Sequence, residues 1–138
     1  MSKDKNAVDF LNLKVKEKGG EESLIPTSRI IFDLTSDLLR VGGFDNKTTA
    51  PQWGAEFHIG QPIKVGTYSF NNSSNSGFYN PKNANASWGS ISDASEITVT
   101  AVDIETRSIA GNFKFTVQDS HDKDKTADVY GNFSFSKS

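Results

Sequence analysis

The chain has 138 residues, a net charge of −2 and no cysteine. The length predicts a single domain with one core, and the charge gives no electrostatic reason to expect nucleic acid or an anionic membrane surface as a partner. The lack of cysteine excludes disulfides, thiolate metal sites and cysteine nucleophiles. No apolar run reaches the roughly 18–20 residues that a membrane-spanning helix needs.

The chain is expected to open with a flexible polar tail over residues 1–8, ahead of one domain over residues 9–138. A first strand is predicted over Phe10–Glu17, where apolar and polar residues alternate. A second strand is predicted from Ser28 to about Leu34. It is expected to continue through residues 35–41 after a bulge, and one helical turn over Ser36–Arg40 is the alternative.

Gly42 and Gly43 are predicted to begin a loop that runs to Lys47. The next strand is indicated by apolar residues at every second position, which alternate with polar or small ones: Trp53, Ala55, Phe57 and Ile59. Residues 71–95 are rich in Asn and Ser, which favour turns over strand pairing. This segment is expected to fold over the edge of the sheet or to hold a short strand around Gly77–Tyr79.

A glycine followed by two aromatics, with one residue between them, occurs at Gly66–Phe70, Gly111–Phe115 and Gly131–Phe135. In a strand, this alternation sends both aromatics to one face. The last two copies follow a strand predicted over Glu96–Val102, and a polar hairpin loop over residues 118–128 joins them. The pattern predicts an all-β, antiparallel β-sandwich of about seven to nine strands, with a small β-barrel as the alternative.

No motif for a nucleophile elbow, a phosphate-binding loop or a dinucleotide site occurs in the chain. His58 and His121 lie in no recognised catalytic arrangement. We therefore expect a protein that is not an enzyme and that uses no cofactor.

The aromatic and amide-rich segment 68–88 is the candidate ligand site, because sugars are held by aromatic faces together with a few polar groups. The candidate ligand-binding residues are Tyr68, Tyr79, Asn80, Asn83, Asn85 and Trp88. Tyr79 and Trp88 would be the stacking platforms. The alternative is that these aromatics hold a long loop against the core.

No metal site is predicted, although one weaker candidate exists in the polar loop near the C-terminus. Calcium binds several carboxylate oxygens, and the residues that could supply them are Asp119, Asp122, Asp124 and Asp128. The lysines interleaved among them argue against a cation site.

Three C-terminal segments, Glu96–Asp103, Ile109–Val117 and Val129–Phe135, carry a resemblance to a known group. In order, they resemble a strand of the form ITxxD, a strand of the form IxGxFxF and a last strand with GxF. This order resembles that of small uncharacterised β-sandwich lipoproteins of Bacteroidetes-type bacteria. The resemblance covers roughly residues 63–136. It implies a β-sandwich that a lipid attaches to an envelope membrane, with no catalytic residues to carry over.

The charged residues 2–6 are similar to the segment that often follows the lipid-bearing cysteine of a bacterial lipoprotein. Met1 is then expected to stand where that cysteine was, and a native cytosolic start is the alternative. The expected location is the cell envelope, in the outer membrane or the periplasm, with a cytoplasmic or secreted protein as the alternative.

The expected function is a non-enzymatic binding or structural module, the soluble part of a bacterial envelope lipoprotein. One alternative is a carbohydrate-binding domain that uses the loop 68–88, and another is an accessory subunit that docks on a protein. The expected partner is an unknown protein or a glycan, with no nucleic acid. Contact with a membrane is expected only through the N-terminal lipid anchor.

Overall fold

A computed structural model describes residues 9–48, 52–71, 73–82 and 86–136, without the side chains of residues 92–94. The predicted tail at residues 1–8 lies outside this part. The described residues form ten strands: β1 Phe10–Glu17, β2 Glu22–Leu24, β3 Arg29–Thr35, β4 Leu38–Phe44, β5 Gly54–Ile59, β6 Gly66–Tyr68, β7 Asn75–Asn80, β8 Trp88–Asp103, β9 Ser108–Gln118 and β10 Thr126–Ser136. In this part of the chain, no helix has the length and apolar character needed to cross a membrane.

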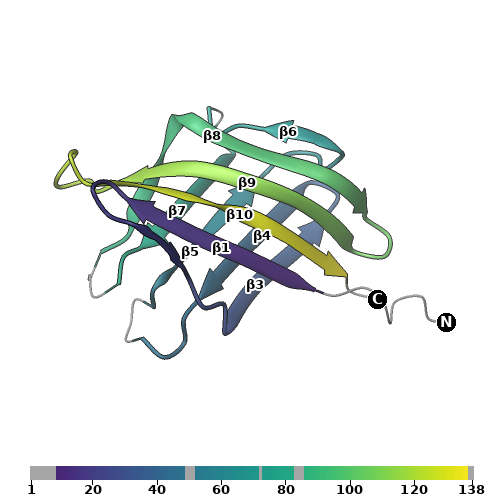
Figure 1. Cartoon of the computed structure of the whole chain (residues 1–138). Helices are drawn as coiled ribbons and strands as arrows, with labels where there is room; N and C mark the ends of the chain where they lie inside the picture. The colour runs from purple at the N-terminus through teal and green to yellow at the C-terminus, as the bar shows by residue number, and fades with distance from the viewer. Residues whose placement is uncertain (1–8, 49–51, 72, 83–85, 137–138) are drawn as a thin grey trace.

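The strands form one antiparallel sheet in the order β2-β1-β10-β9-β8-β7-β5-β4-β3, and β6 pairs with β8. In Figure 1, the strands β1, β10, β9 and β8 lie in front of β7, β5, β4 and β3, so the sheet curls over its own apolar face. Phe32 of β3 stacks on Phe135 of β10 with ring centroids 4.5 Å apart. The predicted all-β class is confirmed, and its two layers belong to one continuous sheet with more strands than expected.

Strand β8 connects the two layers. Its first residues pair with β7, where Tyr79 lies opposite Trp88, and its later residues pair with β6, where Gly66 lies opposite Val99. The register between β8 and β9 shifts between Ser90 and Ser95 and again near Val99. Such irregularities bend and twist a strand, which lets one long strand take part in both layers.

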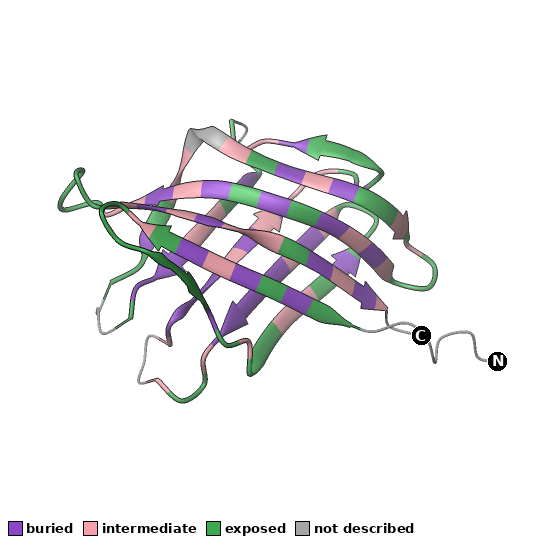
Figure 2. Cartoon of the chain, viewed as in Figure 1, coloured by how far each residue is buried: buried purple, intermediate pink, exposed green. Residues whose placement is uncertain are grey.

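The space between the layers is filled by aromatic side chains. Phe57 of β5 lies with its ring centroid 5.2 Å from Phe113, 5.8 Å from Phe133 and 6.4 Å from Phe115. Figure 2 shows buried positions alternating with intermediate or exposed ones along β9 and β10. A void between the layers beside Phe57 and Phe113 has no volume for a water-sized sphere. This aromatic centre is packed and leaves no room for a ligand, so a binding site would have to lie on the surface.

Two expectations for residues 35–47 are wrong. The second strand ends at Thr35 instead of continuing to residue 41, and no helical turn follows it, because Thr35 pairs with Leu38 across a tight hairpin turn. Gly42 and Gly43 lie inside β4 and not in a loop. A Cβ atom at Gly43 would lie 2.6 Å from Thr27 Cγ2 and 2.9 Å from Leu11 Cδ2, so β4 needs a glycine where these side chains pack.

Segment 71–95, expected to be irregular, contains all of β7 and the start of β8. Of the two alternatives for this segment, the short strand around Gly77–Tyr79 is confirmed, and it extends over Asn75–Asn80. Asn75 is buried, and its side-chain nitrogen donates a hydrogen bond to the carbonyl of Ser69 at 2.9 Å. An asparagine-rich strand is stable here because such buried amides have partners.

Candidate functional site

The predicted aromatic platforms are buried. Tyr68 is 8 % exposed, Tyr79 1 % and Trp88 7 %. Tyr79 and Trp88 pack edge to face with ring centroids 5.8 Å apart, and the Tyr68 hydroxyl donates a hydrogen bond to the carbonyl of Pro62 at 2.8 Å. Stacking on a sugar needs an exposed ring face, so in this structure the three rings hold the segment to the core.

Of the three predicted amide partners, the structure describes only Asn80. Asn80 is 7 % exposed, and its Nδ2 donates a hydrogen bond to the carbonyl of Gln52 at 3.2 Å while its Oδ1 accepts one from the Ser87 hydroxyl. Asn83 and Asn85 lie outside the described residues. The structure therefore does not assemble a sugar site from the described members of this set.

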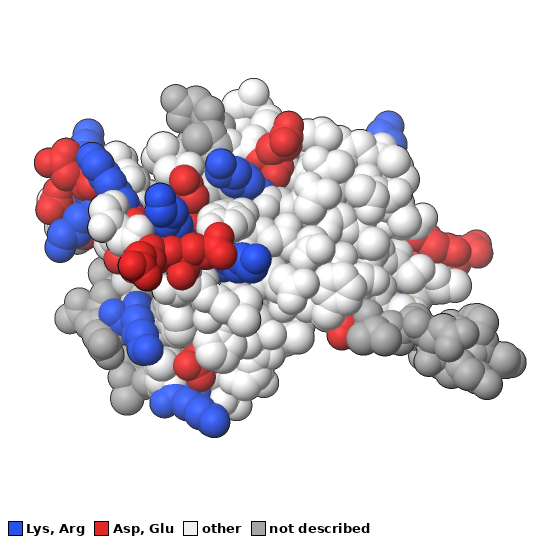
Figure 3. Space-filling view, in the orientation of Figure 1, with Lys and Arg blue, Asp and Glu red and all other residues white. Residues whose placement is uncertain are grey.

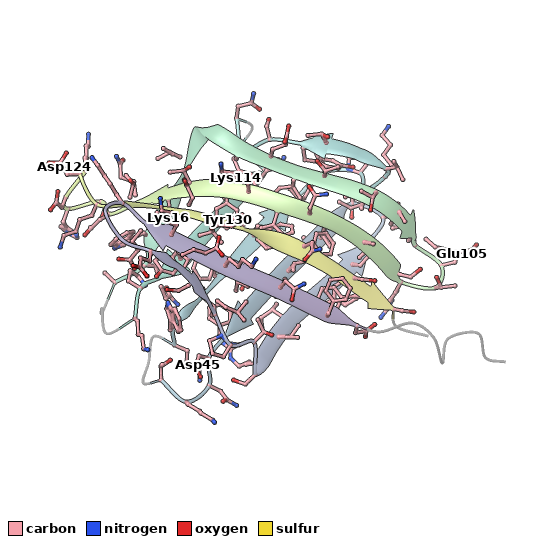
Figure 4. The ribbon with its side chains drawn as sticks, viewed as in Figure 1. Lys16, Asp45, Glu105, Lys114, Asp124 and Tyr130 are labelled. Atoms are coloured by element: carbon pink, nitrogen blue, oxygen red, sulfur yellow. The ribbon has the colours of Figure 1, made fainter. Side chains whose placement is uncertain are left out.

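The aspartates proposed as a weaker cation site point to local partners. Asp119 Oδ1 accepts a hydrogen bond from the backbone N–H of His121 at 2.9 Å, and Asp122 Oδ1 accepts one from Asp124 at 3.1 Å. Asp128 accepts one from the Thr116 hydroxyl at 2.8 Å. Figure 4 shows Asp124 at the tip of the loop between β9 and β10. Within the described part of the chain, no group of three or more His, Asp or Glu side chains is placed to hold a metal ion.

The outer face of the front layer carries a different constellation, which we call the amide–hydroxyl row. Its members lie directly opposite one another on neighbouring strands: Asn12 on β1, Asn132 on β10, Asn112 on β9, Thr98 on β8 and Thr67 on β6. Neighbouring strands are about 4.8 Å apart, so the row extends across the sheet for about 19 Å. It is a continuous line of hydrogen-bonding side chains.

The members of the row are exposed, except for the half-buried Thr98. Asn12 Nδ2 donates a hydrogen bond to Asn132 Oδ1 at 3.0 Å. At the other end, the hydroxyl oxygens of Thr67 and Thr98 are 3.3 Å apart. Each asparagine side chain offers two N–H donors and one carbonyl acceptor, and each threonine hydroxyl can donate or accept. These internal bonds therefore leave free donors and acceptors along the row.

The repeated Gly-Asn-Phe sequence builds the middle of this row. A Cβ atom at Gly111 would lie 2.2 Å from the carbonyl oxygen of Thr98, and one at Gly131 would lie 1.8 Å from that of Asn12. Each glycine therefore permits close approach to the strand that carries the next member of the row. The asparagine that follows faces outward, and the phenylalanine after it enters the core.

Two aromatic residues lie beside the row, one on each side. Each comes two positions before an asparagine of the same strand. Phe10 on β1 precedes Asn12 and is 37 % exposed. Tyr130 on β10 precedes Asn132 and is half-buried. Successive residues of a strand alternate between faces, so both rings share the outer face with the row.

Tyr130 is held in place by its surroundings. Its hydroxyl donates a hydrogen bond to Glu22 of β2, and this bond, ahead of partial burial, raises the pKa of Tyr130 to about 12. The ring is thus neutral at physiological pH. It lies opposite Lys14 on one side and Lys114 on the other, and Figure 4 shows Tyr130 and Lys114 on the front of their strands.

Charge is unevenly distributed over this face. In Figure 3, blue and red side chains gather toward the end where the β9–β10 loop lies, whereas the broad middle of the face is white. The row members carry no formal charge, and the two rings beside them are neutral. This part of the surface can therefore bind a ligand through many neutral hydrogen bonds and ring contacts.

Reasoning from the sequence alone missed the row. The signal that could have found it is the Asn that follows glycine in both Gly111–Phe115 and Gly131–Phe135, but the partners on β1, β8 and β6 depend on strand register. Comparisons of the chain with family models, with curated proteins and with solved structures give no match.

Proposed function

We propose that this protein is a non-enzymatic binding module of the bacterial cell envelope, and that its outer sheet face binds neutral glycans. The observation that supports this most strongly is the amide–hydroxyl row. Sugar hydroxyls both donate and accept hydrogen bonds, as do the side chains of the row. A chain of sugar units lying across the strands would meet one amide or hydroxyl at each strand.

The surroundings of the row support the same ligand class. Tyr130 and Phe10 offer apolar ring surface beside polar groups, the combination typical of small-ligand sites. The row itself is uncharged, so binding a neutral ligand there would not require a formal charge to be stripped of water. Its side chains project from paired strands, which reduces the entropy lost on binding.

The proposed attachment to the envelope by an N-terminal lipid rests on the resemblance of the C-terminal strands to envelope lipoproteins. The geometry is compatible with a tether at one end of the molecule: the backbone N–H of Ser136, at the end of β10, donates a hydrogen bond to Asp9, just before β1, at 2.9 Å. In Figure 1, this end lies opposite the β9–β10 loop. A tether before β1 would leave the charged end directed away from the membrane.

Two measurements test the proposal. A panel of neutral and charged glycans, titrated into the ¹⁵N-labelled protein, should give saturable shifts of the side-chain amides of Asn12, Asn112 and Asn132 for at least one neutral glycan. Only charged glycans binding, or none, would contradict the glycan assignment. Fatty-acid labelling in the native organism tests the anchor, and recovery of the protein without any label would contradict it.

A further inference from the structure

A second surface feature lies at the charged end of the molecule, away from the amide–hydroxyl row. A cavity of about 280 Å³ opens where β1 ends, and five of its lining residues have charged or aromatic side chains: Glu17, Glu21, Trp53, Tyr79 and Lys82. We call it the end pocket. It combines two carboxylates, two aromatic side chains and one ammonium group.

The aromatic side chains of the end pocket are held by burial and hydrogen bonds. Trp53 is 9 % exposed, and its Nε1–H donates a hydrogen bond to the Tyr79 hydroxyl at 3.2 Å. That hydroxyl donates in turn to Glu17 Oε2 at 2.7 Å. Glu17 occupies the same phase of β1 as the buried Leu13 and Val15, so the strand directs its carboxylate inward at the rim of the core. The indole and the carboxylate are thereby fixed relative to each other.

A cation already lies at this aromatic surface. The Nζ atom of Lys82 is 5.0 Å from the centroid of the Trp53 ring. An ammonium group over an indole is attracted by the negative face of the ring, and tryptophan is the best of the aromatic side chains for this contact. Lys82 is itself exposed and follows the end of β7, so it can leave the ring without disturbing a strand.

The formal charge of the groups in the pocket also favours a cation. Glu17 and Glu21 supply two negative charges against the single positive charge of Lys82. Among the described residues that line the pocket, Lys82 is the only basic one, so its departure would leave two carboxylates and Trp53 to face an incoming cation. Carboxylates near an aromatic face are the surroundings that stabilise an organic ammonium ion.

We propose that the end pocket is a binding site for an organic ammonium group, and that Lys82 occupies it in the free protein as an internal competitor. Trp53 contacts the cation through its ring face, and Glu17 and Glu21 neutralise the charge. Tyr79 takes no direct part and is a positioning residue that fixes Trp53 against Glu17. The ammonium group belongs either to a lysine side chain of a peptide or to a quaternary amine of the choline type.

The test uses the indole N–H signals of the full chain, which has two tryptophans. Choline and Nα-acetyl-lysine amide are titrated separately into the wild type and into Lys82→Gln, and 3,3-dimethylbutanol, a neutral analogue of choline, is the control ligand. We expect at least one of the two cations to shift the Trp53 signal saturably. Removal of the competitor should tighten that binding by about two- to fivefold, the range expected for an exposed cation–π contact.

Glu21→Gln removes one of the two negative charges of the pocket. Glu21 is exposed, so this substitution leaves the Glu17–Tyr79 hydrogen bond intact. It should weaken the binding of either cation. The proposal is overturned if neither cation gives a saturable shift in Lys82→Gln, if the neutral analogue binds as well as choline does, or if Glu21→Gln leaves the affinity unchanged. The relative affinities of the two cations decide between a peptide and a choline-type ligand.

Discussion

The hydrogen-bonded chain from Trp53 through Tyr79 to Glu17 gives the sharpest prediction of stability. Tyr79 is 1 % exposed, and its hydroxyl contacts both neighbours, at 3.2 Å from Trp53 Nε1 and 2.7 Å from Glu17 Oε2. Tyr79→Phe keeps the ring and removes only the hydroxyl. The substitution therefore leaves the indole N–H and the carboxylate without this partner.

The expected cost follows from these contacts. A hydrogen bond to a charged group contributes about 1.5–3 kcal/mol to stability, and a buried donor that loses its partner adds a penalty. We expect Tyr79→Phe to lower the free energy of unfolding by about 2–3 kcal/mol at pH 7. Tyr130→Phe is the matched control, because Tyr130 also donates to a glutamate, Glu22, but at the surface. Solvent screens such a pair, so its loss should cost less than about 1 kcal/mol.

Urea denaturation of the wild type and both variants, followed by circular dichroism, measures these differences. If Tyr79→Phe costs no more than Tyr130→Phe, the hydrogen-bonded chain does not stabilise the fold and the reasoning is refuted. A changed dependence on urea concentration would instead indicate an altered denatured state.

The same variant has a signature at high pH. Burial, followed by the hydrogen bond from Tyr79 to Glu17, raises the pKa of the Tyr79 hydroxyl above its ordinary value of 10. Above pH 10, the unfolded chain releases this proton while the folded protein keeps it, so the stability from this group falls as the pH rises. The difference between wild type and Tyr79→Phe should shrink by about 1.4 kcal/mol between pH 9 and pH 11. A constant difference would contradict the raised pKa.

Two further pairs of substitutions test the core and the motif by urea denaturation. Phe133→Ala removes a ring that is 1 % exposed and should lower the free energy of unfolding by about 3–5 kcal/mol. Phe10→Ala, at a ring that is 37 % exposed, should lower it by about 1 kcal/mol or less. Similar losses for the two variants would mean that the assigned inward face of β10 is wrong. Gly131→Ala should cost about 1–3 kcal/mol, because the new Cβ would lie 1.8 Å from the carbonyl oxygen of Asn12. Gly89→Ala, whose Cβ would meet nothing within 4 Å, should be close to neutral, and equal effects at the two glycines would contradict the close approach at Gly131.

Strands with a clear alternation of apolar and polar residues could be predicted from the sequence. The bounds of β1, Phe10–Glu17, match the expectation, because three inward apolar residues precede a glycine turn. β5 and the strands β9 and β10 follow the same alternation. In each of these strands, the pattern of one face carries enough information without knowledge of the neighbours.

Elements whose stability depends on tertiary contacts could not be predicted. Gly42 and Gly43 are turn formers by local preference, yet they lie in β4 because Thr27 and Leu11 leave no room for a side chain at Gly43. The asparagine-rich β7 forms because buried amides such as that of Asn75 find partners from other segments. Local preference is outweighed in both cases by packing or by hydrogen bonds from distant parts of the chain.

The candidate site shows the same limit. The aromatic and amide-rich composition of segment 68–88 predicts Tyr79 and Trp88 as stacking platforms, but each lies in a strand with its ring turned inward. The amide–hydroxyl row joins residues from Asn12 to Asn132, and only the register of five strands brings them together. A single sequence contains the asparagines but not their alignment.

The central claim is that the amide–hydroxyl row binds a glycan, and the double variant Asn112→Ala/Asn132→Ala tests it most directly. Calorimetric titration with the neutral glycan that shifts the row amides should show affinity reduced at least about fivefold, since each of the two lost hydrogen bonds contributes about 0.5–1.5 kcal/mol. Asn71→Ala, an exposed asparagine outside the row, should bind as the wild type does. Unchanged affinity in a folded double variant, or an equal loss in Asn71→Ala, would contradict the account.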